Sequence, residues 1–177
     1  MTNYIETERL LLRPTEWQDF EPWAASMADP EVQLHLGGVQ PKPVAWRTIC
    51  IMAGSWALMG FGMFSVIEKS SGKWIGRLGP WQPDGWPGTE IGWALTRDAW
   101  GKGYATEGAT AATDWAFAHL GWTEVIHSIA PENAASQQVA KRLGSRILRQ
   151  AKLPPPVDRE IDVWGQTREE WFARRPA

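Results

Sequence analysis

The 177-residue chain has little cysteine and little histidine. It contains one cysteine, Cys50, and three histidines. A single cysteine excludes an intramolecular disulfide and a cysteine-based zinc site. The histidines form no cluster with the spacing of metal ligands, so we expect no metal. Because Cys50 lies among apolar residues of a predicted helix, we expect it to be a buried packing residue.

The chain also lacks a strong net charge and a long apolar run. Its formal net charge of −2 gives no electrostatic reason to expect nucleic acid as a partner. The apolar stretch 49–64 is short and interrupted by glycine and serine, so we expect no membrane span. The N-terminus shows no basic segment followed by an apolar run. We therefore expect no signal peptide and a cytoplasmic protein.

What the chain does contain is a succession of predicted strands and helices, in a length typical of one domain. Thr15 with Gln18 has the form of a capping box at the first helix, which Asp29-Pro30 ends. No linker divides the chain, so we expect one domain over residues 1–177. The predicted strands are 5–13, 61–68, 74–78, 89–95, 124–130, 146–150 and 160–164. The predicted helices are 15–27, 44–59, 104–119 and 133–143.

The stretch between the strand 89–95 and the helix 104–119 predicts an anion site. It reads Trp100-Gly101-Lys102-Gly103-Tyr104-Ala105-Thr106-Glu107. Two glycines remove side chains, so that successive backbone N–H groups can point at one anion. The helix start adds unpaired N–H donors and the positive end of its dipole. A strand, a glycine loop and a helix start together favour a phosphate-binding site.

A second informative stretch opens the late helix, which ends at Gly144. It reads Pro131-Glu132-Asn133-Ala134-Ala135-Ser136. With the glycine loop, it resembles the GNAT acyl-CoA N-acyltransferases, in the branch of the RimJ/RimL-type ribosomal-protein N-terminal acetyltransferases. Residues 7–14 and 90–93 are similar to the first and fourth strands of that branch, and 100–107 to its pyrophosphate loop. Asn133-x-x-Ser136 is similar to the start of its late helix.

The resemblance implies an α+β, single-domain GNAT fold. Its central sheet would be mixed and mostly antiparallel, with about seven strands flanked by helices and with strands four and five splayed apart. The resemblance also implies an N-acetyltransferase that uses acetyl-CoA and an amine acceptor in a ternary complex, and it leaves room for a homodimer. The acceptor stays open among a protein N-terminus, an amino acid, a polyamine and an aminoglycoside.

The resemblance further assigns cofactor-binding residues. Backbone N–H groups of the glycine loop would hold the pyrophosphate. The strand end would pair with the pantetheine arm, and a backbone N–H near Ala94 or Leu95 would polarise the thioester carbonyl. Ser136 would contact the sulfur. The assigned residues are Trp93, Ala94, Leu95, Gly101, Lys102, Gly103, Tyr104, Ala105, Thr106, Asn133 and Ser136.

The catalytic candidates are Glu90 and Ser136. An amine that is protonated in water needs a base, and by resemblance Glu90 is the first choice. A solvent-facing carboxylate at a strand end is the alternative interpretation of Glu90. His127 is a second candidate base, although a histidine that alternates with apolar residues is more often a core residue. Ser136 would give the sulfur a hydrogen bond.

Two positions depart from the common family pattern. Many GNAT proteins have Gln or Arg where this chain has Trp100, and a tyrosine where it has Ala140. The missing tyrosine keeps a non-catalytic acyl-CoA-binding module as an alternative. A dinucleotide-binding enzyme ranks lower, because the third glycine of that fingerprint would fall at Thr106.

The 13 tryptophans are the unusual feature of the composition. We expect some of them in core or pocket walls and others in loops beside the site, where as a group they would form an aromatic acceptor pocket. The stiff loop 79–88, rich in proline and tryptophan, is predicted to line that pocket. The first set is Trp74, Trp93 and Trp115, and the second is Trp81, Trp86 and Trp100.

Overall fold

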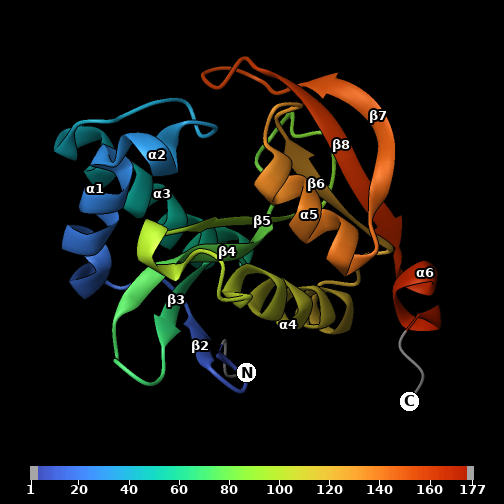
Figure 1. Cartoon of the computed structure of the whole chain (residues 1–177), viewed down its shortest axis with the longest axis horizontal. Coiled ribbons are helices and arrows are strands. Elements are labelled where there is room, and N and C mark those ends of the chain that lie inside the picture. Colours follow the sequence, from blue (N-terminus) through green and yellow to red (C-terminus); the bar gives the residue numbers. More distant parts are fainter. Residues whose placement is uncertain (1–3, 175–177) are drawn as a thin grey trace.

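Eight strands form one sheet in the computed structural model, which describes residues 4–174 (Figure 1). The order is β1-β2-β3-β4-β5-β6-β8-β7, and only the β5–β6 pair is parallel. The strands are β1 Ile5–Glu6, β2 Leu10–Arg13, β3 Phe64–Glu68, β4 Trp74–Trp81, β5 Glu90–Leu95, β6 Glu124–Ile129, β7 Arg146–Lys152 and β8 Glu160–Thr167. The helices are α1 Phe20–Ala28, α2 Pro30–Gln33, α3 Lys42–Met59, α4 Tyr104–His119, α5 Ala134–Leu143 and α6 Arg168–Ala173, with short 3-10 turns at Trp17–Asp19 and Arg97–Ala99.

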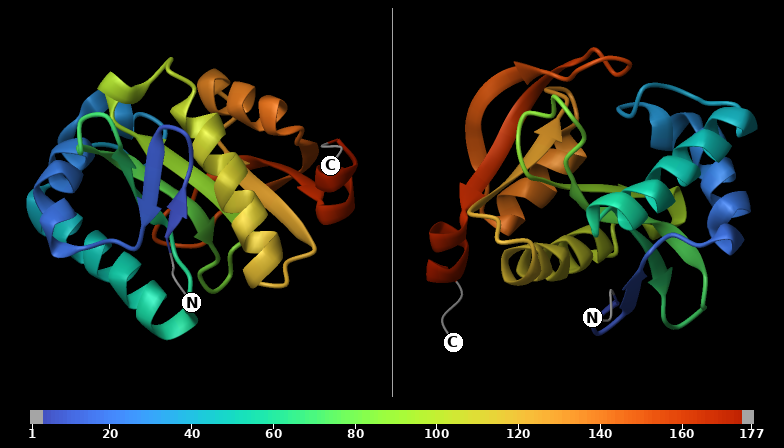
Figure 2. Two further views of the ribbon diagram at one scale, coloured as in Figure 1. Left: turned by 90° about the horizontal axis from the view of Figure 1, so that it is seen from below. Right: turned by 180° about the vertical axis from the view of Figure 1, so that it is seen from behind.

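Helices cover both faces of the first five strands (Figure 2). On one face, α1 and α3 pack together through residues that include Trp23 and Met52. On the other face, α4 lies close to the sheet because its contact residues, which include Ala109, Ala112 and Ala116, are small. A Cβ atom on Gly108 would come within 2.5 Å of Leu78 Cδ2. A larger residue at position 108 would therefore have to displace the buried Leu78 side chain.

The sheet divides where β5 and β6 meet. The two strands share a single residue pair, Glu90 with Ile126, and then diverge. Beyond that point β6 pairs along its length with β8, and β8 pairs with β7. Figure 1 shows β6 and β8 running at a steep angle to β4 and β5. The expected fold, including the splayed fourth and fifth strands of the family pattern, is confirmed.

The sequence predicts about seven strands because the pattern of residues 5–13 is that of a single strand. In the structure a tight turn divides them into β1 and β2. The Thr7 backbone N–H donates to the Leu10 carbonyl at 2.9 Å, and the Leu10 N–H donates to Thr7 Oγ1 at 2.9 Å. The threonine side chain thus stabilises a turn that alternation alone does not predict.

One prediction near the first helix is wrong and one is confirmed. Glu16, not Thr15, caps the 3-10 turn Trp17–Asp19 that precedes α1, and Asp19 Oδ2 accepts the Glu16 N–H at 2.9 Å. Buried Asp19 also binds Arg13 with an N···O distance of 2.6 Å. As predicted, the helix ends at Asp29-Pro30, because α1 stops at Ala28. Pro30 then opens α2, which Asp29 caps by accepting the N–H groups of residues 31 and 32.

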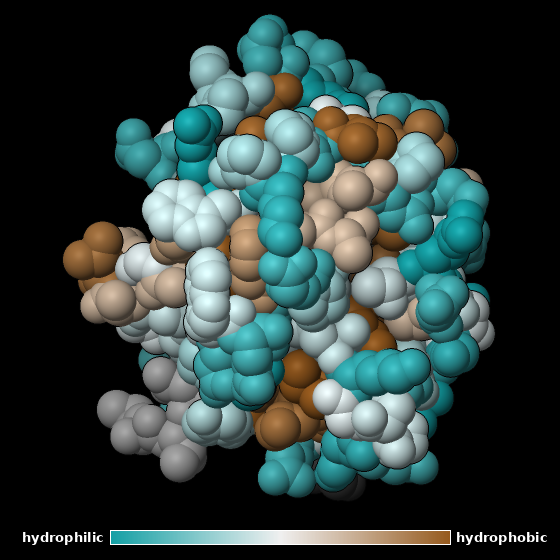
Figure 3. All heavy atoms as spheres, turned by 90° about the vertical axis from the view of Figure 1, so that its left-hand side faces the viewer, coloured by the Kyte–Doolittle hydropathy of each residue, from teal (hydrophilic) through white to brown (hydrophobic). Residues whose placement is uncertain are grey.

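Two further differences concern the surface and the C-terminal part. Cys50 is exposed on α3, so its expected burial is wrong. The short helix α6, which Thr167 and Glu170 cap, follows β8 and was not predicted. Figure 3, viewed from the side of α1, shows hydrophilic residues over most of that face with apolar residues scattered among them. Within residues 4–174 no helix is both long enough and apolar enough to cross a membrane.

Candidate active site

A cleft of about 710 Å³ runs from the start of α4, past the end of β5, to the start of α5. Each of these three elements brings predicted cofactor residues to it. Lys102 is the one predicted cofactor residue that does not line the cleft. The predicted residues that line it are Trp93, Ala94, Leu95, Gly101, Gly103, Tyr104, Ala105, Thr106, Asn133 and Ser136.

The start of α4 presents free hydrogen-bond donors to this cleft. The first hydrogen bond that closes the helix runs from the Glu107 N–H to the Gly103 carbonyl, at 3.0 Å. The N–H groups of residues 104–106 precede it and therefore have no carbonyl partner within the helix. Thr106 Oγ1 is buried and has no hydrogen-bond partner among the described residues. These donors and this hydroxyl fit an anionic group such as a pyrophosphate.

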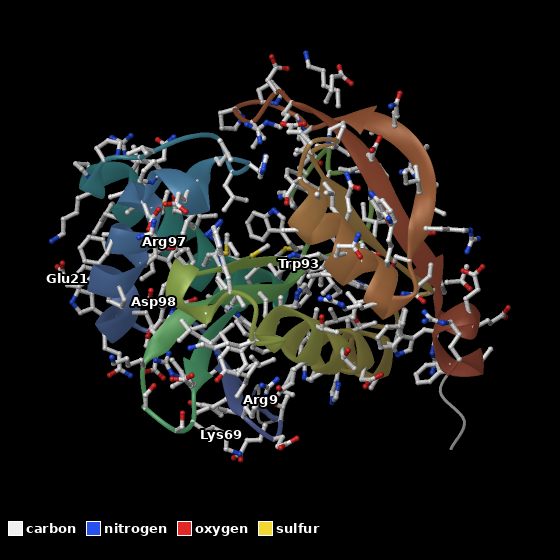
Figure 4. The ribbon with its side chains drawn as sticks, viewed as in Figure 1. Arg9, Glu21, Lys69, Trp93, Arg97 and Asp98 are labelled. Carbon is white, nitrogen blue, oxygen red and sulfur yellow. The ribbon has the colours of Figure 1, made fainter. Side chains whose placement is uncertain are left out.

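The glycine loop is held from behind by the turn between β1 and β2. Arg9 Nη1 donates to the Lys102 carbonyl at 2.9 Å, and Arg9 Nε donates to Glu107 Oε2 at 2.7 Å. The guanidinium also lies over the Tyr104 ring, 4.6 Å from its centroid. Figure 4 shows Arg9 on the β2 side of the loop. Glu107, through Arg9, thus helps to fix the loop.

The indole N–H of Trp100 forms a hydrogen bond within the protein. Its Nε1–H donates to the Leu95 carbonyl at 2.9 Å, while 46% of the residue remains exposed. The indole therefore links the end of β5 to the glycine loop. Its one N–H is engaged with backbone, so Trp100 replaces the side chain that many family members direct at phosphate with an apolar wall of the cleft.

A second cavity, of about 280 Å³, adjoins the first on the α1/α3 face of the sheet. The two share lining residues from β5 and α5, so they meet where the strands diverge. The tryptophans that line the second cavity were predicted as pocket residues, and its wall includes the loop 79–88, as expected. The shared residues include Trp93, Ala94, Asn133 and Ser136, and the tryptophans of the second cavity are Trp81, Trp86 and Trp93.

Glu90 lies inside this second cavity. The residue is 6% exposed, so its interpretation as a solvent-facing carboxylate is wrong. The carboxylate accepts hydrogen bonds from Trp86 Nε1, from Ser128 Oγ at 2.8 Å and from the Ser128 N–H at 3.3 Å. Burial raises the pKa of Glu90, and the hydrogen bonds from Trp86 and Ser128 oppose that rise.

The Glu90 carboxylate lies over the backbone of the next alternate residue, Gly92. A Cβ atom on Gly92 would be 3.2 Å from Glu90 Oε1 and 2.7 Å from Met63 Cε. The missing side chain therefore makes room for the carboxylate to reach along β5 toward Ala94, where the two cavities meet.

His127 is buried and hydrogen-bonded through both ring nitrogens. The residue is 2% exposed, and its Nδ1–H donates to the Ile91 carbonyl at 2.7 Å. Because a carbonyl can only accept, Nδ1 carries the proton and Nε2 accepts from Ser145 Oγ, at 3.0 Å. Burial lowers the pKa of His127 to about 4. Both ring nitrogens are engaged and the ring is neutral, so this geometry favours the core interpretation of His127.

Ser136 lies between the two cavities. Its N–H donates to Asn133 Oδ1 at 3.0 Å, which confirms Asn133 as the helix cap. Its Oγ accepts from Trp93 Nε1 at 3.3 Å, and this bond connects β5 to α5. Figure 4 shows the Trp93 indole in the region between these elements. Since the hydroxyl oxygen accepts from Trp93, the hydroxyl hydrogen is free to be donated into the cleft.

The comparisons with known proteins identify the family. A family model described as "Acetyltransferase (GNAT) domain" matches residues 9–146. The chain belongs to the GNAT acetyltransferase family. It is an acetyltransferase, and acetyl-CoA is the acyl donor of this family.

Three relatives illustrate the GNAT similarity. The "uncharacterized N-acetyltransferase p20" of Bacillus licheniformis is 32% identical over 142 residues, which cover 78% of this chain and 80% of p20. The crystal structure of an acetyltransferase from Agrobacterium tumefaciens is 31% identical, covers 94% of this chain and 95% of that one, and has a TM-score of 0.82. RimJ of Mycobacterium smegmatis, solved in complex with CoA-disulfide, shares the fold, at 22% identity and a TM-score of 0.71 over 91% of this chain and 83% of that one.

Several residues of this GNAT site were not predicted. Ser128 binds the Glu90 carboxylate, Arg9 supports the glycine loop, and Arg77 lines the second cavity. Trp86 was predicted as a pocket residue, but its hydrogen bond to Glu90 was not. The others act across 38 to 93 residues of sequence or through one sheet face, for which local pattern gives no indication. Within residues 4–174, no three His, Cys, Asp or Glu side chains are grouped to hold a metal ion.

Proposed function

We propose that this GNAT protein transfers the acetyl group of acetyl-CoA to a primary amine by direct attack in a ternary complex. One observation carries the proposal. The cleft with the pyrophosphate-type donors and the cavity with the buried carboxylate Glu90 meet at Trp93, Ala94 and Ser136. A thioester that reached this junction from the α4 side would face an amine that reached it from the Glu90 side.

Each wall of the junction has one role in the proposed reaction. Glu90 takes a proton from the ammonium form of the acceptor, for which a carboxylate of raised pKa is suited. The free amine forms a C–N bond to the acetyl carbon, the C–S bond breaks, and the proton that the attacking nitrogen then loses is gained by the CoA thiolate, which leaves as the free thiol. A backbone N–H at Ala94 or Leu95 would donate to the carbonyl oxygen, and Ser136 Oγ–H would donate to the leaving thiolate.

The position of β5 explains why its backbone can take part. Beyond Glu90, the strand has no partner on the β6 side, because the two strands diverge. Unpaired backbone groups at a strand edge can pair with an amide-containing ligand. The pantetheine arm contains two such amides, so the divergence offers it a place without disrupting the sheet.

The test is a measurement of free thiol release from acetyl-CoA with a panel of primary amines. The panel holds an amino acid, a polyamine, an aminoglycoside and a peptide with a free N-terminus. We expect amine-dependent thiol release and a mass gain of one acetyl group on an amine. Stoichiometric CoA binding in calorimetry with no turnover on any amine would instead favour the acyl-CoA-binding module.

A further inference from the structure

Arg77 of β4 lines the second cavity, here called the acceptor cavity because in the proposed reaction it would hold the amine. Its Nε is buried without a hydrogen bond, and among residues 4–174 no carboxylate lies within 4.0 Å of its guanidinium. The guanidinium carbon lies 5.0 Å from the centroid of the Trp23 ring. Burial lowers the pKa of Arg77 to about 10, which still leaves it cationic at neutral pH. The residue is half-buried, and a partly desolvated cation without a carboxylate partner is costly, so a ligand anion is the partner that would offset this cost.

The register of the sheet places Arg77 beside the proposed reaction centre. Arg77 pairs with Ala94 across β4 and β5, and Trp81 pairs with Glu90. Since side chains alternate along strands, Arg77 and Glu90 lie on the same face of the sheet. Glu90 reaches over Gly92, which is two residues, or roughly 7 Å, from Ala94. An acidic and a basic group thus flank the place where the two cavities meet.

Most of the remaining wall of the cavity is apolar, and it includes three indoles and two methionines. The second guanidinium of the lining, Arg159, already donates to the His35 carbonyl at 2.6 Å. Two cations and one carboxylate disfavour a polycationic acceptor. The indoles and methionines of the lining are Met52, Met63, Trp81, Trp86 and Trp93.

We infer that the acceptor is a free α-amino acid with an apolar or aromatic side chain, whose carboxylate pairs with Arg77 while its amine faces Glu90. The inference rests on the proposed function and names the substrate class of that site. Arg77 supplies two parallel N–H donors that match a carboxylate. The indoles and methionines contact the side chain. A peptide amine would place an amide at Arg77, and a polyamine would place a second cation there.

Matched acceptors test the inference. Methionine, phenylalanine and tryptophan are compared with their carboxamides, in thiol release and in calorimetric binding to the CoA-loaded protein. We expect each acid to exceed its carboxamide by roughly 10- to 100-fold in kcat/KM, the range of one charge-assisted pairing. Equal use of acids and carboxamides would overturn the inference and leave the proposed transferase standing. Acids that bind through Arg77 without thiol release would support the carboxylate site and contradict the transferase.

Two variants separate recognition from folding. Arg77→Met keeps the apolar stem and removes the charge, and Arg47→Met removes a cation from the exposed surface of α3. We expect Arg77→Met to lower kcat/KM for the acids roughly 10- to 100-fold, to leave the carboxamides and the acetyl-CoA affinity unchanged, and to keep or raise the melting temperature. Arg47→Met should resemble the wild type. An unchanged ratio of acid to carboxamide in Arg77→Met, or no binding of any of the three acids to the wild type, would overturn the inference.

Discussion

Glu90 of β5 binds Ser128 of β6 across the point where the two strands part. The carboxylate accepts the Ser128 hydroxyl at 2.8 Å and the Ser128 N–H at 3.3 Å, immediately beyond the single pair that joins the strands. The side chain therefore satisfies a backbone donor that the divergence leaves without a strand partner. The same carboxylate lines the acceptor cavity. Glu90 therefore has both a structural role and a proposed catalytic role.

His127 should prove structural. His127→Phe keeps an aromatic ring beside Trp93 but leaves the Ile91 carbonyl and Ser145 without their partner. We expect a loss of about 1–3 kcal/mol in the free energy of unfolding, measured by denaturant titration, with the acidic limb of the pH–rate profile retained. Loss of that limb with unchanged stability would make His127 the base.

The pH dependence of stability tests independently whether His127 is buried and neutral in the folded protein. Its folded pKa of about 4 lies below the ordinary histidine value of 6.5, so the unfolded state binds more protons between these values. The wild type should therefore lose stability as the pH falls through 6.5 toward 4. His127→Phe should lack this part of the decline, which thermal melts at a series of pH values would show.

The glycine loop can be tested with a matched pair of glycines. Gly101 and Gly72 have φ angles of 73° and 69°, and a Cβ atom on either would meet no atom within 4 Å. Replacement by alanine should therefore cost each about 1 kcal/mol of backbone strain. Only Gly101→Ala should also weaken acetyl-CoA binding, measured by calorimetry. Equal affinity in both variants would argue against a pyrophosphate at this loop.

Ser136→Ala should lower turnover about tenfold, the effect of one hydrogen bond of roughly 1–1.5 kcal/mol, and should leave acetyl-CoA affinity nearly unchanged. Ser55→Ala is the control, because its hydroxyl donates to the Phe61 carbonyl at 2.8 Å and Ser55 lines neither cavity. An equal effect of the two changes on kcat would remove Ser136 from the proposed mechanism.

Local signals in the sequence predicted α4 and the cap of α5 correctly, because glycine loops and capping residues act within a few residues. The burial of Cys50 was predicted wrongly, because α3 is apolar on more than one face. Ile49 is buried while the adjacent Cys50 and Ile51 are exposed, and periodicity could not distinguish these faces. The divergence of the strands was expected only through the family resemblance.

The surroundings of Glu90 could not be predicted from its position at a strand end. Its burial comes from the loop that brings Trp86 over the carboxylate and from Ser128, 38 residues away in sequence. The support of the glycine loop by Arg9 and Glu107 likewise joins residues 98 apart. Such contacts follow from the topology of the sheet, for which no local pattern is a guide.

The central claim is that Glu90 accepts the proton of the amine, and the pH–rate profile of Glu90→Gln tests it most directly. Because the pKa of Glu90 is raised, the wild type should lose kcat/KM with a midpoint above the ordinary value of 4.5 as the pH falls. Glu90→Gln should lower kcat/KM by roughly 100-fold or more, abolish that limb and leave acetyl-CoA affinity unchanged. The exposed Glu124→Gln is the control and should behave as the wild type. A Glu90→Gln variant with full rate and an intact acidic limb would contradict the account.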